Sequence, residues 1–243
     1  MERQPDRNEI SEYYGSFCEE EKSLKLNLRH YSVFYHLVKA GLKKNHSVLE
    51  IGCGFGTITS LIARYLKQGT LVATDISKER IESCRRTLGK YKNASFVLTD
   101  MTDFNHQGKF DFIVLPDVLE HIPEEAHFEL FRLMSSYLKE SGVIFIHLPH
   151  PTALDYVRKH TPEALQIIDQ SISTDGMLKN AYAHGLRLEQ LRSYSLGKEQ
   201  SDYQIIVFCK NRPFESMTTR ATNRIRWDKL RKRWFLFRKL FLG

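Results

Sequence analysis

The feature that most constrains the fold of this chain is a glycine-rich turn that directly follows a short apolar run. The run Val48–Gly52 has the length of a buried strand, and the turn reads Gly52-Cys53-Gly54-Phe55-Gly56 before a helix-sized segment. Glycines at alternate positions let the backbone turn tightly and approach a ligand where a Cβ would intervene. The helix that follows offers unpaired N–H groups and a partial positive charge to an anionic group. A strand, a glycine turn and a helix in this order are typical of an open α/β sheet, which binds ligands at the carboxyl ends of its strands.

The rest of the chain alternates between β-rich runs and helix-sized segments. The strands that we predict after the first are Thr70–Asp75, Ser95–Thr99, Phe110–Leu115, Val143–Leu148, Leu186–Ser195 and Tyr203–Cys209, and the helices between them are Thr57–Lys67, Lys78–Lys90 and Glu124–Lys139. Alternation of this kind predicts an α/β fold, a doubly wound and mostly parallel sheet with helices on both faces. The last two strands are close enough in sequence to form an antiparallel hairpin at one edge.

The segments outside this alternation suggest a division of the chain. Residues 9–40 look helical and rich in aromatic side chains, so we expect a helical N-terminal cap over residues 1–45. The sheet domain is expected over residues 46–210. Within it, residues 149–185 hold Pro151 and Pro162 and are expected to form part of a substrate pocket.

Composition removes several classes of protein. The 243 residues include no run of 18 apolar residues, which a membrane-spanning helix would need. The first ten residues are charged and lack the apolar stretch of a secretory signal. The four cysteines are scattered, without C-x-x-C pairs, so reduced thiols in a cytoplasmic protein are expected.

A second ligand signal is Asp75, which ends the second predicted strand about 20 residues after the glycine turn. A carboxylate there can accept two hydrogen bonds from a ribose. The dinucleotide fingerprint is G-x-G-x-x-G, whereas this chain has G-x-G-x-G preceded by the acid Glu50. An acid beside the loop suits a cationic cofactor better than a pyrophosphate.

The stretch Leu49–Gly56, LEIGCGFG, resembles motif I of the class I S-adenosylmethionine-dependent methyltransferases. Asp75, Asp100-Met101 and the stretch Leu115–Pro123, LPDVLEHIP, resemble the later motifs of that family in the same order. The resemblance covers roughly residues 46–150 and implies a Rossmann-like sheet and S-adenosylmethionine as cofactor. The cofactor-binding residues that it implies are Glu50, Gly52, Gly54, Gly56, Asp75, Ile76, Asp100, Met101 and Asp117. Local capping roles for Glu50 and Asp100 are the alternative.

The same resemblance places the loop after the fourth strand opposite the transferred methyl group. This loop holds Asp117, Glu120 and His121, and its pattern looks like the E-x-x-E-H metal motif of quinone-pathway and small-RNA methyltransferases, with Asp117 in place of the first Glu. Two carboxylates and an imidazole could bind Mg²⁺, but the same pattern occurs widely without metal, so we predict no metal site. If the acceptor is a hydroxyl, a base must take its proton. The candidates are His121, His147 and His150.

These observations predict an O-methyltransferase for a hydroxyl on a glycan, a lipid-linked saccharide or another small molecule. The alternatives are a metal-dependent quinone or RNA 2′-O-methyltransferase and a catalytically silent, methyltransferase-like binding protein. The N-terminal cap, with Arg29, His30, Tyr13 and Tyr14, could line a lid over the cofactor, although packing is the commoner role of such aromatics. The sequence gives no indication of oligomeric state.

The basic charge of the protein lies in its last residues. Residues 210–243 hold eleven Lys/Arg against Glu215 and Asp228, a net of +9, whereas residues 1–209 carry a net of −2. On a helix, one apolar stripe would form in residues 211–243, consisting of Trp227, Leu230, Trp234, Phe237 and Phe241. Aromatics beside Lys and Arg are typical of a helix in a membrane interface, so we expect an anionic membrane surface as partner and peripheral attachment at its cytoplasmic face. Packing on the domain is the alternative; nucleic acid fits less well, because phosphate contacts do not require so many apolar residues.

Overall fold

The computed structural model describes residues 5–16, 25–212, 230, 231 and 234. Contacts divide the chain into one unit that ends at Asn211 and a second from Arg212 to Gly243. The predicted amphipathic tail therefore lies almost entirely outside the described residues, and its interpretation stays a prediction. Among the residues that the structure describes, no helix is both long enough and apolar enough to cross a bilayer.

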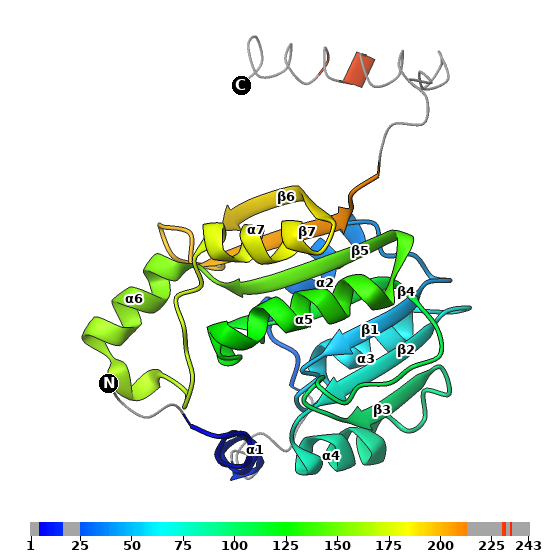
Figure 1. The fold of residues 1–243 in the computed structure, drawn as a ribbon, viewed down its shortest axis with the longest axis horizontal. Helices are drawn as coiled ribbons and strands as arrows, with labels where there is room; N and C mark the ends of the chain where they lie inside the picture. Colours follow the sequence, from blue (N-terminus) through cyan, green and yellow to red (C-terminus); the bar gives the residue numbers. More distant parts are fainter. Residues whose placement is uncertain (1–4, 17–24, 213–229, 232–233, 235–243) are drawn as a thin grey trace. The chain divides into compact units, whose positions relative to one another are not determined.

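A seven-stranded sheet in the order β3-β2-β1-β4-β5-β7-β6 forms the centre of the first unit (Figure 1). The strands β1 to β5 run parallel, whereas β7 lies antiparallel between β5 and β6. The doubly wound sheet with an antiparallel C-terminal hairpin is thus confirmed. The strands are β1 (Ser47–Ile51), β2 (Thr70–Asp75), β3 (Ala94–Leu98), β4 (Phe110–Pro116), β5 (Leu138–Pro149), β6 (Leu186–Tyr194) and β7 (Tyr203–Lys210).

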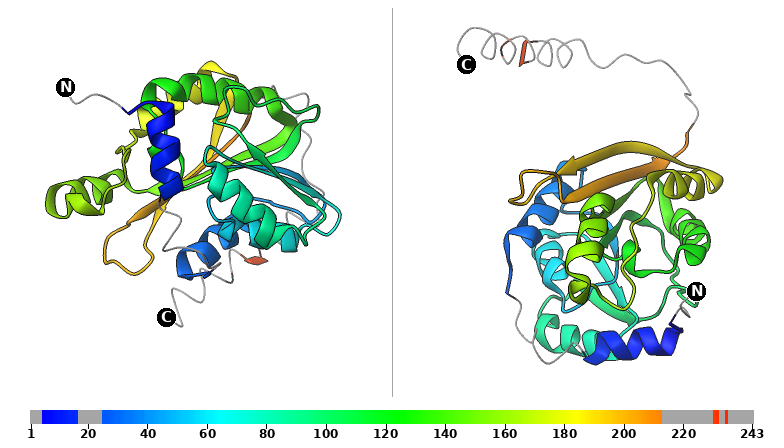
Figure 2. Two further views of the ribbon diagram at one scale, coloured as in Figure 1. Left: turned by 90° about the horizontal axis from the view of Figure 1, so that it is seen from below. Right: turned by 90° about the vertical axis from the view of Figure 1, so that its left-hand side faces the viewer.

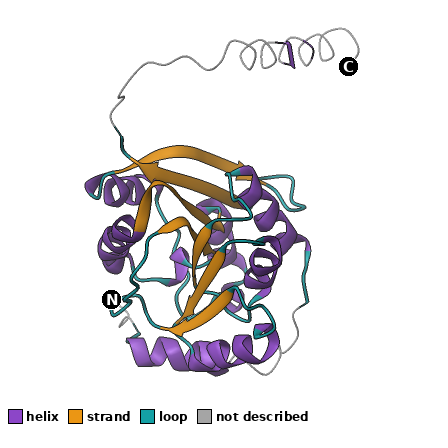
Figure 3. Cartoon of the chain, turned by 90° about the vertical axis from the view of Figure 1, so that its right-hand side faces the viewer, coloured by secondary structure: helices purple, strands orange, loops and turns teal. Residues whose placement is uncertain are grey.

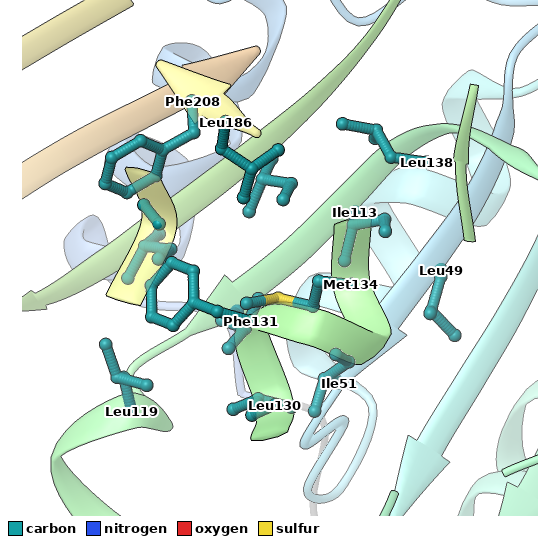
Figure 4. Close-up of a cluster of buried hydrophobic side chains, with 14 of the residues drawn as sticks. Leu49, Ile51, Ile113, Leu119, Leu130, Phe131, Met134, Leu138, Leu186 and Phe208 are labelled. Carbon is teal, nitrogen blue, oxygen red and sulfur yellow. The ribbon is translucent and has the colours of Figure 1, made fainter. Parts of the chain in front are cut away.

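Helices cover both faces of the sheet, as Figures 2 and 3 show. Alternate residues of β4 enter different clusters: Phe112 and Val114 pack with α2 and α3, and Ile113 and Leu115 pack with α5. Both faces of this central strand are therefore buried, which explains its continuous apolar sequence. Figure 4 shows the cluster on the α5 side, in which Ile113, Phe131 and Met134 come together with Phe208 of β7.

The helices agree with the predicted ones except near the N-terminus. They are α1 (Arg7–Ser16), α2 (Leu28–Lys39), α3 (Thr57–Tyr65), α4 (Lys78–Leu88), α5 (Glu124–Tyr137), α6 (Pro151–His160) and α7 (Thr174–Ala183), with short 3-10 helices η2 (Leu119–His121) and η3 (Pro162–Ala164). The region predicted to be helical, residues 9–40, contains α1 and α2, but Lys25–Asn27 directly before α2 are not helical. Asn27 caps α2 instead, because its side chain accepts a hydrogen bond from His30 N.

The fifth strand also begins earlier than predicted. Leu138 already pairs with Phe110, and an irregularity between Phe110 and Phe112 absorbs the change in register before Val143 pairs with Phe112. The residues between Leu138 and Val143 are polar or glycine, so a search for apolar runs does not detect the start of the strand.

The register brings the predicted functional segments to one edge of the sheet. Ile51 pairs with Thr74, and Pro116 pairs with His147, so the residues that follow β1, β2 and β4 emerge beside one another. This edge is where parallel α/β sheets bind their ligands.

Candidate active site

A cavity of about 1920 Å³ opens at the carboxyl ends of β1, β2 and β4. The glycine loop, the loops after β2 and β4, and parts of α1, α2 and α6 line it. Ligand pockets usually measure roughly 300–1,000 Å³, so this cavity is large enough for a cofactor and an acceptor together.

The three glycines of the loop have positive φ, with values of 74° at Gly52, 52° at Gly54 and 84° at Gly56. They differ in what surrounds them. A Cβ on Gly52 would come 2.4 Å from Val118 Cγ2, and one on Gly56 would come 2.5 Å from Leu88 Cδ1. A Cβ on Gly54 would meet no atom within 4 Å. Gly54 therefore borders open space in the cavity, while Gly52 and Gly56 are needed for the loop to pack; Gly56 does not line the cavity.

Glu50 lies beneath the loop and lines the cavity, although it is fully buried. Neither of its carboxylate oxygens accepts a hydrogen bond from a residue that the structure describes. Burial raises the pKa of the Glu50 carboxyl to about 8; the neighbouring Thr59 hydroxyl opposes this shift and the Asp75 carboxylate adds to it. A buried carboxyl without a protein partner at a cavity wall fits a cationic ligand, whose charge would favour the ionised form.

Asp75 ends β2 and is also buried at the cavity. Its Oδ2 accepts a hydrogen bond from Gly54 N at 2.8 Å, and its Oδ1 accepts one from Ser77 N at 2.9 Å. Asp75 thus fixes the glycine loop, and its remaining lone pairs can accept hydrogen bonds from a ribose. Ile76 lines the same part of the cavity.

Asp100 and Met101 follow β3 and both line the cavity. Asp100 Oδ1 accepts hydrogen bonds from Thr102 N at 2.9 Å and Thr102 Oγ1 at 2.6 Å, so the local capping role is present. Met101 and Asp117 are the non-glycine residues with positive φ in the described part of the chain, at 74° and 56°. Such backbone costs on the order of 1–3 kcal/mol and clusters at functional sites; both of these residues border this cavity.

Asp117 has a close partner at each of its carboxylate oxygens. Its Oδ1 lies 2.5 Å from His147 Nδ1, and its Oδ2 lies 3.0 Å from the Arg29 guanidinium of α2. His147 in turn contacts the hydroxyl of Tyr194 through Nε2 at 2.7 Å. Burial alone would raise the pKa of Asp117, but His147 and Arg29 outweigh it and hold this pKa below its ordinary value.

His121 ends η2 and lines the cavity. Its Nδ1 lies 2.6 Å from the carbonyl oxygen of Ile168 and 3.2 Å from Asp169 Oδ1. A carbonyl accepts only, so Nδ1 carries the hydrogen and Nε2 carries the lone pair. Burial lowers the pKa of His121, with Ile168 and Asp169 opposing the shift. The ring is thus a neutral base at neutral pH.

Glu120 is the third member of the predicted D-x-x-E-H pattern. It is buried at the cavity, and its Oε1 lies 3.9 Å from His121 Nε2, beyond hydrogen-bonding distance. Burial, reinforced by the charge of Asp117, raises the pKa of Glu120 well above its ordinary range. Its surroundings therefore favour the neutral form of the Glu120 carboxyl.

The donor set does not fit a divalent cation. The oxygens of Asp117 are engaged by His147 and Arg29, and the Nδ1 of His121 faces Ile168 and Asp169. Within residues 5–16 and 25–212, no three His, Cys, Asp or Glu side chains lie close enough together to hold a metal ion.

The three candidate histidines are placed differently. Only His121 lines the cavity. His147 is fully buried behind Asp117 with both ring nitrogens engaged, so it is placed to position Asp117. His150 caps α6, because its Nδ1 accepts a hydrogen bond from Thr152 N and lies 2.8 Å from Thr152 Oγ1.

The structure also brings in residues that sequence patterns missed. Asp169, in the expected substrate-pocket segment, lies beside His121. Arg80 of α4 lines the cavity, with its guanidinium 4.7 Å from the ring centroid of Tyr14 and 5.3 Å from that of Phe55. The Tyr14 ring lies 6.0 Å from that of His121, so α1 contributes to one side of the cavity. No local motif marks Asp169 or Arg80.

Comparisons with known proteins agree with this geometry. Residues 48–142 match the model of a methyltransferase domain family. The chain is 27% identical over 131 residues to a malonyl-[acyl-carrier protein] O-methyltransferase of Ilyobacter polytropus, covering 54% of this chain and 46% of the relative. It is 30% identical over 121 residues to the (S)-coclaurine N-methyltransferase of Papaver somniferum, covering 48% of this chain and 34% of the relative. The chain thus spans half or less of the length of these curated relatives.

Solved structures show the same fold. The magnesium protoporphyrin IX methyltransferase of Synechocystis PCC 6803 with bound SAH superposes with a TM-score of 0.65 and 16% identity, over 85% of this chain and all of that one. The N-methyltransferase NodS of Bradyrhizobium japonicum gives 0.59 at 18% identity, over 76% of this chain and 98% of that one. Residues 48–142 thus match a methyltransferase domain, and the chain has the sheet topology and fold of S-adenosylmethionine-dependent methyltransferases of known structure.

Proposed function

We propose that this protein transfers a methyl group from S-adenosylmethionine to a hydroxyl of a small molecule or glycan, with His121 as the general base. The observation that carries the proposal is the hydrogen bond from His121 Nδ1 to the Ile168 carbonyl, which leaves Nε2 as the basic nitrogen of a buried, neutral ring at the cavity. A hydroxyl must lose its proton during methylation, and a positioned base contributes about 10²–10⁴-fold to the rate.

The residues around the glycine loop fit the cofactor. Asp75 would accept hydrogen bonds from the ribose, Gly54 leaves room for close approach, and the unpaired Glu50 carboxyl would face positive charge. Asp100 and Met101 border the remaining part of that region. When bound, S-adenosylmethionine supplies a methyl group already activated for displacement, and the carbon–sulfur bond breaks as the carbon–oxygen bond forms.

The protein then has two chemical tasks. The cavity walls hold the acceptor oxygen in line with the methyl group, which is the main source of acceleration in such displacements. His121 Nε2 takes the hydroxyl proton, and the Asp169 carboxylate at 3.2 Å from Nδ1 stabilises the positive ring that results. In this arrangement the carboxylate orients the imidazole, and the imidazole acts as the base toward the acceptor hydroxyl.

Peripheral membrane attachment through residues 211–243 remains part of the proposal. It rests on the apolar stripe and the net charge of +9 in residues 210–243. Such an attachment at the cytoplasmic face would favour a lipid-linked glycan or a lipid quinone as acceptor.

The experiment is cofactor turnover against panels of sugars, hydroquinones, amines and RNA, each with magnesium and with a chelator. We expect S-adenosylhomocysteine to accumulate with a hydroxyl acceptor and equally in chelator. Turnover only with amines would overturn the assignment of a hydroxyl acceptor, and turnover only with magnesium would overturn the metal-free mechanism.

A further inference from the structure

One helix of the folded unit presents apolar side chains on both of its sides. The inner side of α2 is buried through Val33 and Leu37. On the other side, Leu28, Tyr31, Tyr35 and Val38 are exposed to 68%, 53%, 55% and 37%. Spacings of three, four and three residues place these four on one stripe. We call this stripe the α2 outer face. A surface helix ordinarily carries polar residues there, so the stripe calls for a partner.

The chain segment that contains α2 carries charge of one sign. From Lys25 to Leu49 the chain holds no Asp or Glu, but it holds Lys25, Arg29, Lys39, Lys43 and Lys44. Arg29 is compensated by Asp117, whereas the four lysines are exposed. Lys39 Nζ lies 5.5 Å from the centroid of the Tyr35 ring, so positive charge adjoins the stripe itself.

We infer that the α2 outer face docks on an anionic lipid bilayer. Tyr side chains suit the boundary between headgroups and acyl chains, because one end is apolar and the other polar. Each lysine near an anionic membrane surface adds electrostatic attraction to it. A second copy of this chain would bring the same lysines against one another, so charge favours the lipid surface.

The inference deepens the proposed function and rests on it. The first turn of α2 contributes Arg29 and His30 to the cavity wall. Docking through the α2 outer face would bring this rim of the cavity to the bilayer surface. It points to an acceptor hydroxyl carried on a membrane lipid.

The test compares full-length proteins on vesicles of phosphatidylglycerol and phosphatidylcholine in equal amounts. Tyr31→Ser/Tyr35→Ser removes the centre of the α2 outer face, and Leu98→Ser/Tyr182→Ser is the matched control, since these two side chains are 46% and 54% exposed elsewhere. Because all proteins keep residues 211–243, any difference belongs to the folded unit. We expect the vesicle partition coefficient of the α2 variant to fall roughly ten-fold or more, because about one apolar side chain would no longer enter the lipid. The partition coefficient of the control should match that of wild type.

Hydrogen exchange on the wild-type protein gives a second readout that needs no variant. Amides of residues 28–39 should exchange more slowly with these vesicles than without them, and vesicles of phosphatidylcholine alone should have a smaller effect. Unchanged exchange in α2, or equal partition of the two double variants, would overturn the inference. The inference would also be overturned if the wild-type protein proved to be a dimer, and if Tyr31→Ser/Tyr35→Ser dissociated this dimer without changing vesicle partition. Calorimetric binding of S-adenosylhomocysteine tests the cofactor site separately: its absence would contradict the proposed function and leave the vesicle result to stand by itself.

Discussion

Asp169 Oδ1 lies 3.2 Å from Nδ1 of His121, the nitrogen that also contacts the Ile168 carbonyl at 2.6 Å. The backbone contact sets the tautomer, and the carboxylate adds negative charge on the side of the ring away from Nε2. The pair has the composition of a base and the group that orients it. The segment between α6 and α7 therefore supplies the partner of the proposed base as well as a wall of the cavity.

The base is tested by His121→Ala. We expect kcat to fall about 10²–10⁴-fold, with the dissociation constant for S-adenosylhomocysteine changing less than about three-fold. His150→Ala is the control, because it removes a histidine that only caps α6; its thermal stability should drop slightly while its turnover stays near wild type. Wild-type turnover in His121→Ala would exclude His121 as the base.

Asp169→Asn tests the orienting role through the pH profile. The Asp169 charge raises the pKa of His121, so its loss should lower that pKa and move the acidic limb of kcat to lower pH. The plateau rate should fall as well, because the positive ring loses its partner. A variant with reduced activity but an unshifted acidic limb would assign Asp169 a purely structural role.

The cofactor loop is tested by Asp75→Ala. Loss of the hydrogen bonds at Asp75 should weaken S-adenosylmethionine binding by roughly 1–3 kcal/mol, measured by calorimetry on protein whose circular dichroism is unchanged. Asp100→Ala is a useful comparison, since Asp100 Oδ1 already serves Thr102, and a smaller loss is expected there. Unchanged affinity in folded Asp75→Ala would remove Asp75 from the site.

Glu50 should make the cofactor-free protein less stable as pH rises. Its pKa is about 8 in the folded protein against an ordinary 4.5, so between these values the folded state binds a proton that the unfolded state has released. The free energy of unfolding then falls with rising pH. Glu50→Gln should be more stable than wild type by about 4 kcal/mol at pH 8 and by little at pH 4. Urea unfolding at both pH values measures this, and an equal difference at both would show that the pKa of Glu50 is not raised in the folded protein.

The tail is tested by flotation of the full chain and of a chain that ends at Arg212. We expect the full chain to float more strongly with anionic vesicles at low salt, because the removed residues hold most of the basic charge and the apolar stripe. Equal flotation of both proteins would show that the apolar stripe does not bind the membrane, and that it packs on the domain or forms an oligomer contact instead.

The sequence alone determined the sheet and predicted where the cofactor site lies. Apolar runs, helical spacing and glycine turns are local properties of the chain, and they predicted all seven strands and the acids Glu50 and Asp75 at strand ends. The same local reasoning extended the helical region through Lys25–Asn27. These residues are not helical, because Asn27 caps the start of α2. It also missed the start of β5 at Leu138, because pairing with Phe110 supports a strand that no apolar pattern marks.

Only the tertiary structure decided which residues of the site act together. The sequence offered three equivalent glycines and three equivalent histidines, and packing separated them: Gly54 borders open space while Gly56 packs on Leu88, and His121 reaches the cavity while His147 is buried against Asp117. The partner of His121 comes from a distant segment that carries no motif. A hydrogen bond between side chains forms only when the separation of donor and acceptor is right to within a few tenths of an ångström. Here the partners come from strands and loops far apart in sequence, and no periodicity along the chain encodes their separation.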